Sequence, residues 1–448
     1  MADVIPFRGI IYNIQKIGDL SLVTSPPYDV ISEKAKQRYY EKHPYNVIRL
    51  ELGDENLSKD RYYSSLFYLE EWLRNGILIR ENEPAFYFYQ IDFPLNGMKW
   101  KRRRGFIGLC KLEEFGKGMI FPHERIHQAQ KEDRLNILRI CQANFSQIFS
   151  LYSDPNQIIN SLFEDYTHNP PLFDYYNDEE KIHHKLWSIK DRELFLKVRK
   201  MMEPKALLIA DGHHRYEAAL AYKKEMEKKF PLSTGNEPFY YTMMYFCPIE
   251  DEGLVILPSH RLIFNLSTFN PNEFEIELQK YFIKRDIHFS HENELAKLEE
   301  FFEILKRDDS KGNVFGLYIN GNSHFSLLYL KNELNISSLV GNCLPSVLQK
   351  LDVMILHRFV IEQLLGIKEK DQDQNHIRII KNHNRAFELV KKGNFQMVFF
   401  LNPPKVEEIK EVASEGEIMP QKSTFFYPKI PTGLVINKFF LNETINEF

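Results

Sequence analysis

The clearest candidate for chemistry is a run of five residues whose types suit a phosphate site: Asp211, Gly212, His213, His214 and Arg215. Arg215 can bind a phosphate through two parallel hydrogen bonds, and the two histidines can donate hydrogen bonds or transfer a proton. Asp211 can hold a divalent metal ion or orient a histidine. The alternative is a polar cap on a buried helix, but two adjacent histidines beside Asp and Arg exceed what a cap requires.

A second polar segment contains His123, Glu124, Arg125 and His127, with Lys131 shortly after it. The spacing H-E-x-x-H is that of a zinc-peptidase helix. Pro122 stands directly before it and no apolar stripe precedes it, so the long helix which that site needs is missing. We instead predict a loop-to-helix junction in which Glu124 is a general base while Arg125 and Lys131 face an anionic ligand. A solvated charged turn is the alternative.

A third segment near the end of the chain consists of Lys422, Ser423 and Thr424. Gly416 precedes the lysine at the spacing of a phosphate-binding loop, but Gln421 replaces the second glycine of that motif and no helix start follows. The segment is therefore not a Walker loop. Its lysine and hydroxyl groups, together with Lys429, could still bind a phosphate or carboxylate. A solvated tail is the alternative.

The elements around the first run would place it at the start of a helix. Residues 206–210 predict a buried strand, and the apolar spacing afterwards predicts a helix over 215–229. A helix that begins directly after a strand points free N–H groups and its positive dipole end at one place, which is an anion site. Residues 86–91 and 100–110 predict a hairpin whose basic residues 99–104 either guard a solvated edge or contact nucleic acid.

The rest of the chain predicts further lobes. After a linker at 231–238, alternating residues predict a second sheet at 240–246 and 255–257. Helices are expected over 271–281, 292–306 and 344–366, and a late strand over 395–401. We expect an N-terminal lobe over 1–235 that holds the phosphate site, a second α+β lobe over 236–340, and a C-terminal segment over 341–448 whose loop returns to the site.

Composition bounds the class of protein. The 58 basic and 62 acidic residues leave a net charge of −4, too small for the overall field to attract nucleic acid or an anionic membrane. No run approaches the ~20 apolar residues of a transmembrane helix, and the N-terminus lacks a signal-peptide pattern. The four widely spaced cysteines predict buried thiols in a reducing compartment. We therefore expect a cytoplasmic protein.

Several segments, in this order, resemble the domain-of-unknown-function 1015 family over nearly the whole chain. They are P-P-Y-D-V-I-S at 26–32, H-P-Y-N-V-I-R-L at 43–50, P-H-E-R at 122–125, K-E-D-R at 131–134, I-A-D-G-H-H-R-Y-E-A-A-L at 209–220, L-P-S-H-R at 257–261 and M-P-Q-K-S-T-F-F-Y-P-K at 419–429. Several long motifs in the right order are more specific than any single one.

The D-G-H-H-R run is also similar to the box of the ParB and sulfiredoxin-like nucleotide-binding superfamily, most of all in its free-serine kinases. The resemblance implies an α+β fold whose ParB/sulfiredoxin-like core has a mixed sheet, elaborated by the second lobe and the C-terminal segment. It implies that residues of the box, Gly212, His214 and Arg215 among them, hold nucleotide phosphates, and that a separate glutamate deprotonates a serine hydroxyl. Glu124 is our candidate for this glutamate on chemical grounds.

These observations favour a small-molecule kinase that transfers a phosphoryl group from ATP, or from ADP or pyrophosphate, to the hydroxyl of a serine-like metabolite. Mg²⁺ would lie near Asp211, and His213 would contact phosphate. A nucleotide-dependent, ParB-like protein that associates with DNA is the alternative, although the net charge and the lack of a helix-turn-helix pattern oppose it. A metal-dependent hydrolase using His123, His127 and Asp211 is the third possibility.

Overall fold

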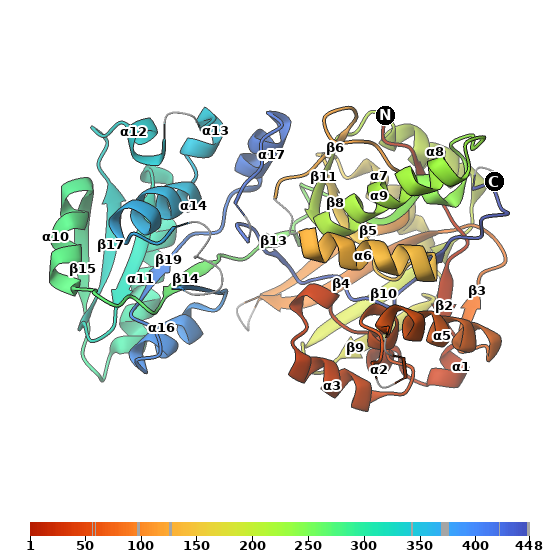
Figure 1. Cartoon of the computed structure of the whole chain (residues 1–448), viewed down its shortest axis with the longest axis horizontal. Coiled ribbons are helices and arrows are strands. Elements are labelled where there is room, and N and C mark those ends of the chain that lie inside the picture. Colours follow the sequence, from red (N-terminus) through yellow and green to blue (C-terminus); the bar gives the residue numbers. More distant parts are fainter. Residues whose placement is uncertain are drawn as a thin grey trace. The chain divides into compact units, whose positions relative to one another are not determined.

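The computed structural model describes residues 1–55, 57–58, 60–95, 99–124, 128–341, 344–368, 376–420 and 422–445. The chain divides into two compact units, which we call unit 1 (Met1–Val255 and Phe426–Phe448) and unit 2 (Ile256–Phe425). Figure 1 labels their elements. Both units combine helices with a sheet, so the α+β prediction is confirmed.

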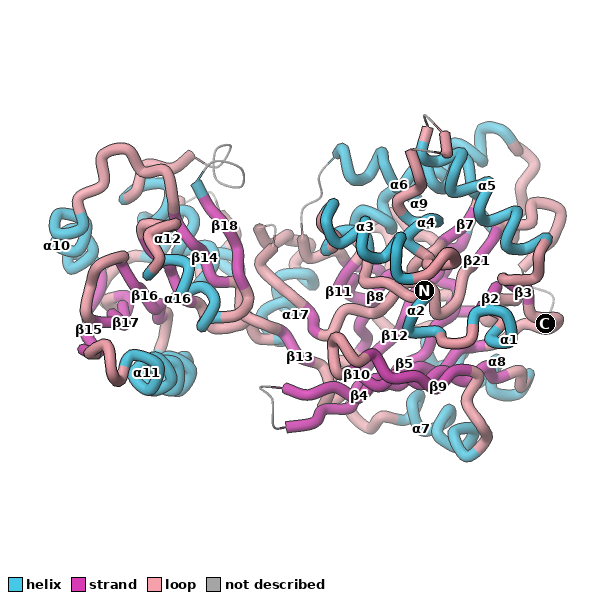
Figure 2. The backbone as a smooth tube through the Cα atoms, turned by 90° about the horizontal axis from the view of Figure 1, so that it is seen from below, coloured by secondary structure: helices cyan, strands magenta, loops and turns pink. Residues whose placement is uncertain are grey.

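Unit 1 is built on a mixed nine-stranded sheet (Figure 2). Its strand order is β6 (Ile120–Phe121), β11 (Leu207–Asp211), β8 (Ile148–Tyr152), β12 (Tyr241–Pro248), β5 (Lys99–Lys111), β4 (Phe86–Leu95), β10 (Ile182–Ile189) and β9 (Phe173–Asn177), with β1 (Val4–Ile5) paired to β5. The pairs β11–β6 and β12–β8 are parallel, and the others are antiparallel. Shorter strands are β2 (Ile10–Tyr12), β3 (Leu78–Arg80), β7 (Ala143–Asn144), β13 (Val255–Ile256), β20 (Phe426–Tyr427) and β21 (Asn437–Lys438).

The helices of unit 1 lie before and between these strands in the sequence. They are α1 (Ile14–Ile17), α2 (Leu20–Val23), α3 (Glu33–Lys42), α4 (Ile48–Glu51), α5 (Arg61–Arg74), α6 (Gln128–Cys141), α7 (Ile158–Glu164), α8 (Arg192–Met202) and α9 (His213–Lys229), with 3₁₀ turns η1 (Tyr28–Val30), η2 (Asp165–His168) and η3 (Pro238–Tyr240). The predicted strand at 206–210 and helix at 215–229 correspond to β11 and α9. In the described ranges, no helix is long and apolar enough to cross a membrane.

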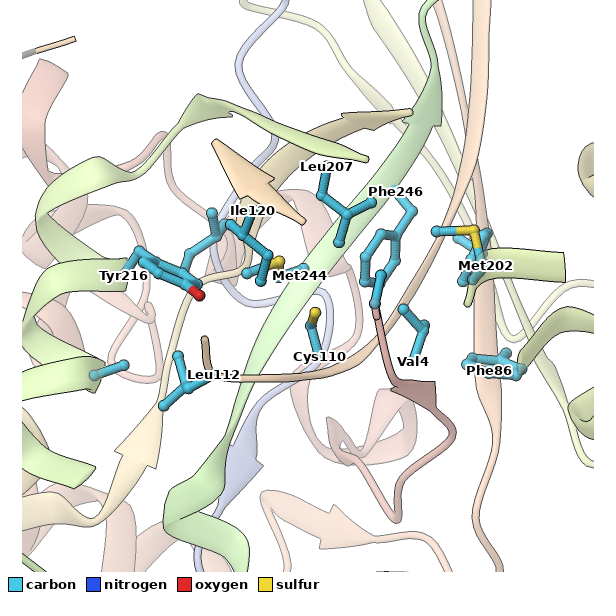
Figure 3. Packing of buried hydrophobic residues seen from close by; sticks show 14 of the residues in the cluster. Val4, Phe86, Cys110, Leu112, Ile120, Met202, Leu207, Tyr216, Met244 and Phe246 are labelled. Carbon is cyan, nitrogen blue, oxygen red and sulfur yellow. The ribbon is translucent and has the colours of Figure 1, made fainter. Parts of the chain in front are cut away.

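One face of the sheet forms the main apolar core of unit 1. Phe86 of β4 packs edge-on against Phe106 of β5 and against Phe195 of α8. Figure 3 shows Phe246 and Tyr216, from β12 and α9, pointing into the same cluster. Burying each such aromatic side chain contributes ~1.5–3 kcal/mol relative to exposure, so this core fixes α9, and with it the box at its start, against the sheet.

Strands β4 and β5 form the predicted hairpin. Among its basic residues, Lys99 and Arg102 are exposed as a solvated edge predicts, whereas Arg103 is buried. On one side, β5 pairs with β4 along residues 99–107 and with β1 at Leu109 and Cys110. On the other side, β12 pairs with residues 106–111, so that part of β5 lies inside the sheet. Residues 240–246, which the sequence assigns to a second sheet, form most of β12 in unit 1. The first unit therefore extends past residue 235, because an alternating pattern identifies a strand without identifying its partner.

Unit 2 contains a six-stranded antiparallel sheet. Its strand order is β15 (Phe282–His288), β17 (His324–Leu330), β16 (Val314–Ile319), β19 (Met397–Phe400), β14 (His260–Ile263) and β18 (Ile377–Ile380). Its helices are α10 (Pro271–Tyr281), α11 (Glu294–Asp308), α12 (Ile336–Val340), α13 (Ser346–Gln349), α14 (Asp352–Met354), α16 (His383–Lys391), α17 (Val406–Ser414), the 3₁₀ turn η4 (Asp309–Lys311) and the π-helix η5 (Ile355–Leu364). The helix predicted at 271–281, the helix near 292–306 and the strand near 395–401 are confirmed.

Two apolar clusters cover the two faces of this second sheet. Along β16, Phe315 and Leu317 belong to one cluster, while Val314 and Tyr318 belong to the other. This is the two-residue alternation of a strand that is buried on both faces. The predicted C-terminal segment is divided, because the chain returns to unit 1 at Phe426.

The cysteines carry no disulfide in the part of the chain described. Cys110, Cys141 and Cys247 are free and buried, as predicted, and Cys343 lies outside the described residues. Burial raises the pKa of Cys141 to about 12, so this thiol stays protonated at neutral pH.

Candidate active site

The D-G-H-H-R box lies at the junction of a strand and a helix, as predicted. Asp211 is the last residue of β11, and His213 is the first residue of α9. Gly212 lies between them with a φ of 95°, a left-handed conformation that favours glycine. A Cβ atom added there would also come within 2.8 Å of Nε of Arg215. The box therefore needs glycine for both its backbone conformation and its space.

Asp211 is held between two cations. One carboxylate oxygen accepts a hydrogen bond from Nη2 of Arg215 at 2.7 Å, and the other contacts Nζ of Lys429. Burial opposes ionisation of this carboxyl, but attraction to Lys429 and Arg215 lowers its pKa to about 2. Asp211 is therefore ionised at neutral pH, and its two cationic partners outnumber it.

The guanidinium group of Arg215 is fixed before any ligand binds. Its Nη1 donates to the backbone carbonyl of Gln147 at 2.7 Å, while Nη2 donates to Asp211. Its Nε atom is buried and has no hydrogen-bond partner among the described residues. The predicted two-pronged contact with phosphate would thus compete with Asp211, and Arg215 also positions that carboxylate.

The P-H-E-R segment lies against the box. The backbone N–H of His123 donates to Nε2 of His213 at 3.3 Å, and the two rings meet edge-on with centroids 4.7 Å apart. On its other side, Nδ1 of His123 lies 2.6 Å from the carbonyl of Ile209. The structure therefore brings together two segments that the sequence singled out separately.

Both buried histidines are neutral at pH 7. Burial lowers the pKa of His123 to about 4 and that of His213 well below its ordinary value. Since Nε2 of neutral His213 accepts a hydrogen bond, its proton is on Nδ1. His213 therefore acts as a hydrogen-bond donor, and the predicted proton shuttle through a charged His213 is disfavoured by its depressed pKa.

The other residues predicted around P-H-E-R are placed differently. Glu124 follows His123 and is half-buried beside the box, whereas Arg125 and His127 lie outside the described residues. Lys131 of α6 forms an ion pair with Glu217 of α9 at 3.1 Å, so its charge is already compensated. His214 is half-buried in the first turn of α9. Glu124 follows His123 and His214 follows His213, so both residues adjoin the pair of buried histidines.

The P-P-Y-D loop contributes a carboxylate that sequence reasoning missed. Asp29 lies in the 3₁₀ turn η1. Desolvation and then repulsion from Asp211 raise the pKa of Asp29, whereas Lys429 and Arg215 lower it. The carboxyl group of Asp29 therefore lies within electrostatic range of Asp211, Lys429 and Arg215. The available signal was the Tyr-Asp pair after two prolines in the motif P-P-Y-D-V-I-S at 26–32.

A buried ion pair holds the P-P-Y-D loop in place. The guanidinium of Arg134 lies over the ring of Tyr28 at 3.9 Å and binds the carboxylate of Glu51 at 2.6 Å. Arg134 belongs to the K-E-D-R motif and Glu51 follows H-P-Y-N-V-I-R-L. Three motifs that are distant in sequence therefore meet beside the box.

Lys429 reaches Asp211 because a buried arginine anchors the chain before it. Arg103 of β5 donates to the carbonyls of Tyr427 (3.2 Å) and Pro428 (2.8 Å), and its guanidinium lies 4.8 Å from the centre of the Phe149 ring. Arg103 is completely buried. Clustered positive charge predicted exposure, so composition gave no signal for this role.

Three other cations of β5 are also engaged within unit 1. Arg102 pairs with Asp92 at 2.7 Å, and Arg104 pairs with Glu164. Nζ of Lys101 donates to the carbonyl of Glu252. Two of the hairpin's arginines are therefore already paired with carboxylates, and no specific observation favours the DNA-associated alternative.

The predicted Lys422-Ser423-Thr424 contacts belong to unit 2. The carbonyl of Lys422 accepts a hydrogen bond from Arg261 at 3.4 Å, and Oγ of Ser423 donates to the carbonyl of Pro420 at 2.6 Å. Ser423 and Thr424 are both buried. Their role at the phosphate site stays a prediction.

The hydrolase alternative requires a metal-binding cluster around His123, His127 and Asp211. Within the described ranges, no group of three or more His, Cys, Asp or Glu side chains is arranged to hold a metal ion. His127 lies outside those ranges, and Nδ1 of His123 is engaged by Ile209. The geometry described therefore gives no support to this alternative.

A family profile described as "Protein of unknown function (DUF1015)" matches residues 4–354. The chain belongs to this family. No curated protein matches the sequence. The motifs that meet at the site, from P-P-Y-D to D-G-H-H-R, fall inside the matched range.

Three solved structures are similar to part of this chain at low TM-scores. A mutant free serine kinase in complex with AMP is 12% identical with a TM-score of 0.33, covering 72% of this chain and 89% of that one. A conserved hypothetical protein from Pyrococcus furiosus is 15% identical with a TM-score of 0.32 (72% and 92% covered). SbnI with a C-terminal truncation, from Staphylococcus aureus, is 11% identical with a TM-score of 0.30 (73% and 81% covered). At these TM-scores the likenesses carry no argument about function.

Proposed function

We propose that this DUF1015 protein is a small-molecule kinase with a ParB/sulfiredoxin-like core, which transfers a phosphoryl group from a nucleotide to the hydroxyl of a serine-like metabolite. One observation carries the proposal. Lys429 and Arg215 flank Asp211 at the first turn of α9, where backbone N–H groups and the helix dipole also favour an anion. Phosphoryl transfer depends mainly on positioning and charge neutralisation, which such a cluster supplies.

The residues of the box would bind the nucleotide phosphates in distinct ways. Gly212 leaves the backbone open to close approach, and the first N–H groups of α9, including that of His214, would donate to phosphate oxygens. Lys429 and Arg215 would neutralise negative charge, and Nδ1–H of His213 would donate one further hydrogen bond. ATP is the expected donor, with ADP or pyrophosphate as alternatives.

The donor set also fits a magnesium ion. Mg²⁺ in phosphate sites is bound by one or two carboxylates together with phosphate oxygens. Asp29 and Asp211 are two carboxylates that repel one another, and a divalent cation would relieve that repulsion. Such an ion would supply neutralisation of the charge on the transferred phosphate. These two residues would hold it.

Glu124 would accept the proton of the attacking hydroxyl. A positioned general base contributes roughly 10² to 10⁴ in rate, so Glu124→Gln should lower kcat by that factor while nucleotide affinity stays nearly unchanged. The exposed Glu193→Gln serves as control. Unchanged kcat in Glu124→Gln would exclude Glu124 as the base and transfer the role to Asp29, which Asp29→Asn would then test.

The proposed activity is tested by incubating the protein with Mg²⁺, a mixture of amino acids and, in turn, ATP, ADP or pyrophosphate. Mass spectrometry should detect a phosphate-sized mass increase on serine or a close analogue. Lys429→Met should abolish it. The proposal is overturned if no amino acid or hydroxylated metabolite gains phosphate with any donor and calorimetry detects no nucleotide binding.

A further inference from the structure

Unit 2 contains a polar cavity of about 290 Å³ that the proposed phosphotransfer site in unit 1 does not use. This volume is near the lower end of the range for small-molecule pockets. The lining includes Ser259 beside β14, Asn313 beside β16, Asp352 at the start of α14, and Lys405 and Glu408 at the start of α17. Several separate elements of the unit therefore direct polar groups at one space.

Ser259 gives the first indication of a ligand. Its side chain is only 3% exposed, and its Oγ atom has no hydrogen-bond partner among the described residues. A buried hydroxyl without a partner is costly, so nearly all such groups in folded proteins are satisfied. Because Ser259 lines the cavity, a bound molecule can supply the missing partner.

Asp352 gives the second indication, and a neighbouring amide fixes its position. Nδ2 of Asn313 donates to Asp352 at 2.7 Å and to the carbonyl of Lys350 at 2.8 Å. Burial is the main cause that raises the pKa of Asp352 to about 7, and Asp309 and Glu408 raise it further. The carboxyl therefore sits in surroundings that lack a compensating positive charge.

The other charges around the cavity do not provide this compensation. Lys405 is paired with Asp309 at 2.7 Å, which leaves its attraction for Asp352 weak. Glu408 accepts a hydrogen bond from the backbone N–H of Lys405 at 2.9 Å and remains an acid beside the cavity. Lys350 is the remaining lysine of the lining. The carboxyl groups of Asp352 and Glu408 then share a single lysine, Lys350, so one more positive charge would balance the lining of the cavity.

We propose that this cavity binds a small metabolite through a primary ammonium group, which donates hydrogen bonds to the carboxylate of Asp352 and to Oγ of Ser259. An ammonium group has three donors and no acceptor, which matches an anionic carboxylate beside an unpartnered hydroxyl. The site is independent of the nucleotide, so it is tested without one.

The test uses the full-length protein, with putrescine as the probe and 1,4-butanediol as its uncharged counterpart of similar length. Calorimetry should detect putrescine binding at least tenfold tighter than that of butanediol. Affinity should rise about tenfold from pH 6 to pH 8, because a cation binds the ionised form of a carboxyl whose pKa is about 7. Equal binding of both probes, or no binding of putrescine, overturns the proposal.

Two variants separate a binding role from a structural one. Asp352→Asn keeps an acceptor for Asn313 and should lose both the putrescine affinity and its pH dependence. Ser259→Ala removes a hydroxyl that has no partner, so it should fold normally and weaken putrescine binding several-fold. Glu300→Gln, an exposed change on α11 of the same unit, is the control. Unchanged putrescine affinity in folded Asp352→Asn and Ser259→Ala would contradict the proposed site.

Discussion

At the scale of single residues, the site is a problem of charge balance around Asp211. One carboxylate binds Arg215 and Lys429, and a second carboxylate, Asp29, lies within electrostatic range of the same groups. The histidines beside them are neutral, because burial lowers their pKa values. The cluster therefore holds its charges in place without a ligand, which is the preorganisation that anion binding and phosphoryl transfer require.

Arg215→Lys should weaken nucleotide binding even though the charge remains. Lysine cannot donate to both Gln147 and Asp211 in the planar geometry of a guanidinium, so we expect a loss of about 1–3 kcal/mol in binding free energy. Calorimetry with ATP measures this loss. Lys224→Met, an exposed change on the same helix, should leave affinity unchanged. Wild-type affinity in Arg215→Lys would remove this side chain from the binding site.

Asp211 should make stability depend on pH in acid. Its pKa falls from a usual 3.8 to about 2 on folding, so its contribution is present above pH 4 and is lost as the pH falls through 2. The shift corresponds to about 2 kcal/mol. The free energy of unfolding in urea is measured for the wild type and for Asp211→Asn at pH 5 and at pH 2. The two proteins have all other carboxyl groups in common, so the change in their difference with pH isolates this contribution. A difference between the two proteins that does not change with pH would mean that the carboxylate charge is not stabilising.

At the scale of elements, the sequence was informative wherever the signal is local. The strand, loop and helix around Gly212 follow from an apolar run, a turn residue and a helical spacing, and all three were predictable. The contact of Asp211 with Lys429 spans 218 residues and leaves no local trace. The burial of Arg103 was not predictable for another reason. A run of basic residues predicts exposure, whereas Arg103 is buried because carbonyl groups near the end of the chain accept its hydrogen bonds.

Arg103→Met should both destabilise unit 1 and weaken nucleotide binding. The variant loses two hydrogen bonds from a charged donor to the carbonyls of Tyr427 and Pro428, and each such bond is worth ~1.5–3 kcal/mol. Because these bonds place Lys429, affinity should fall together with the melting temperature. Arg102→Met is the matched control, since that side chain is exposed and should cost less than ~0.5 kcal/mol.

A positioning role for Arg103 has a distinct signature in the kinetics. The KM for the nucleotide should rise more than kcat falls, because Lys429 is displaced while the groups around the acceptor stay in place. A variant that melts earlier but binds nucleotide with wild-type affinity would show that Arg103 stabilises the sheet without positioning Lys429.

At the scale of the whole molecule, unit 1 is assembled from the two ends of the chain. Residues after Phe426 return to it, and Leu434, Val435 and Ile436 of that segment are buried. Unit 2 is inserted between β13 and β20. Sequence alone predicted three consecutive segments. The periodicity of apolar residues identifies helices and strands in chain order, but it does not show which distant segments pack into the same core. Two signals in the sequence linked this stretch to the predicted site: its lysine and hydroxyl residues, and the family motif at 419–429.

This assembly predicts that unit 1 can bind nucleotide alone. A chain of residues 1–255 joined by a flexible Gly/Ser linker to 426–448 keeps Asp29, Asp211, Arg215 and Lys429, so ATP affinity should stay within about threefold of the full-length value. Residues 1–255 alone lack Lys429 and the buried C-terminal segment, and should lose binding by at least tenfold. Calorimetry on both, with circular dichroism to verify folding, makes the comparison. The linked chain lacks Lys422, Ser423 and Thr424. If it folds but binds ATP much more weakly than the full chain, the predicted phosphate contacts of these three residues are supported instead.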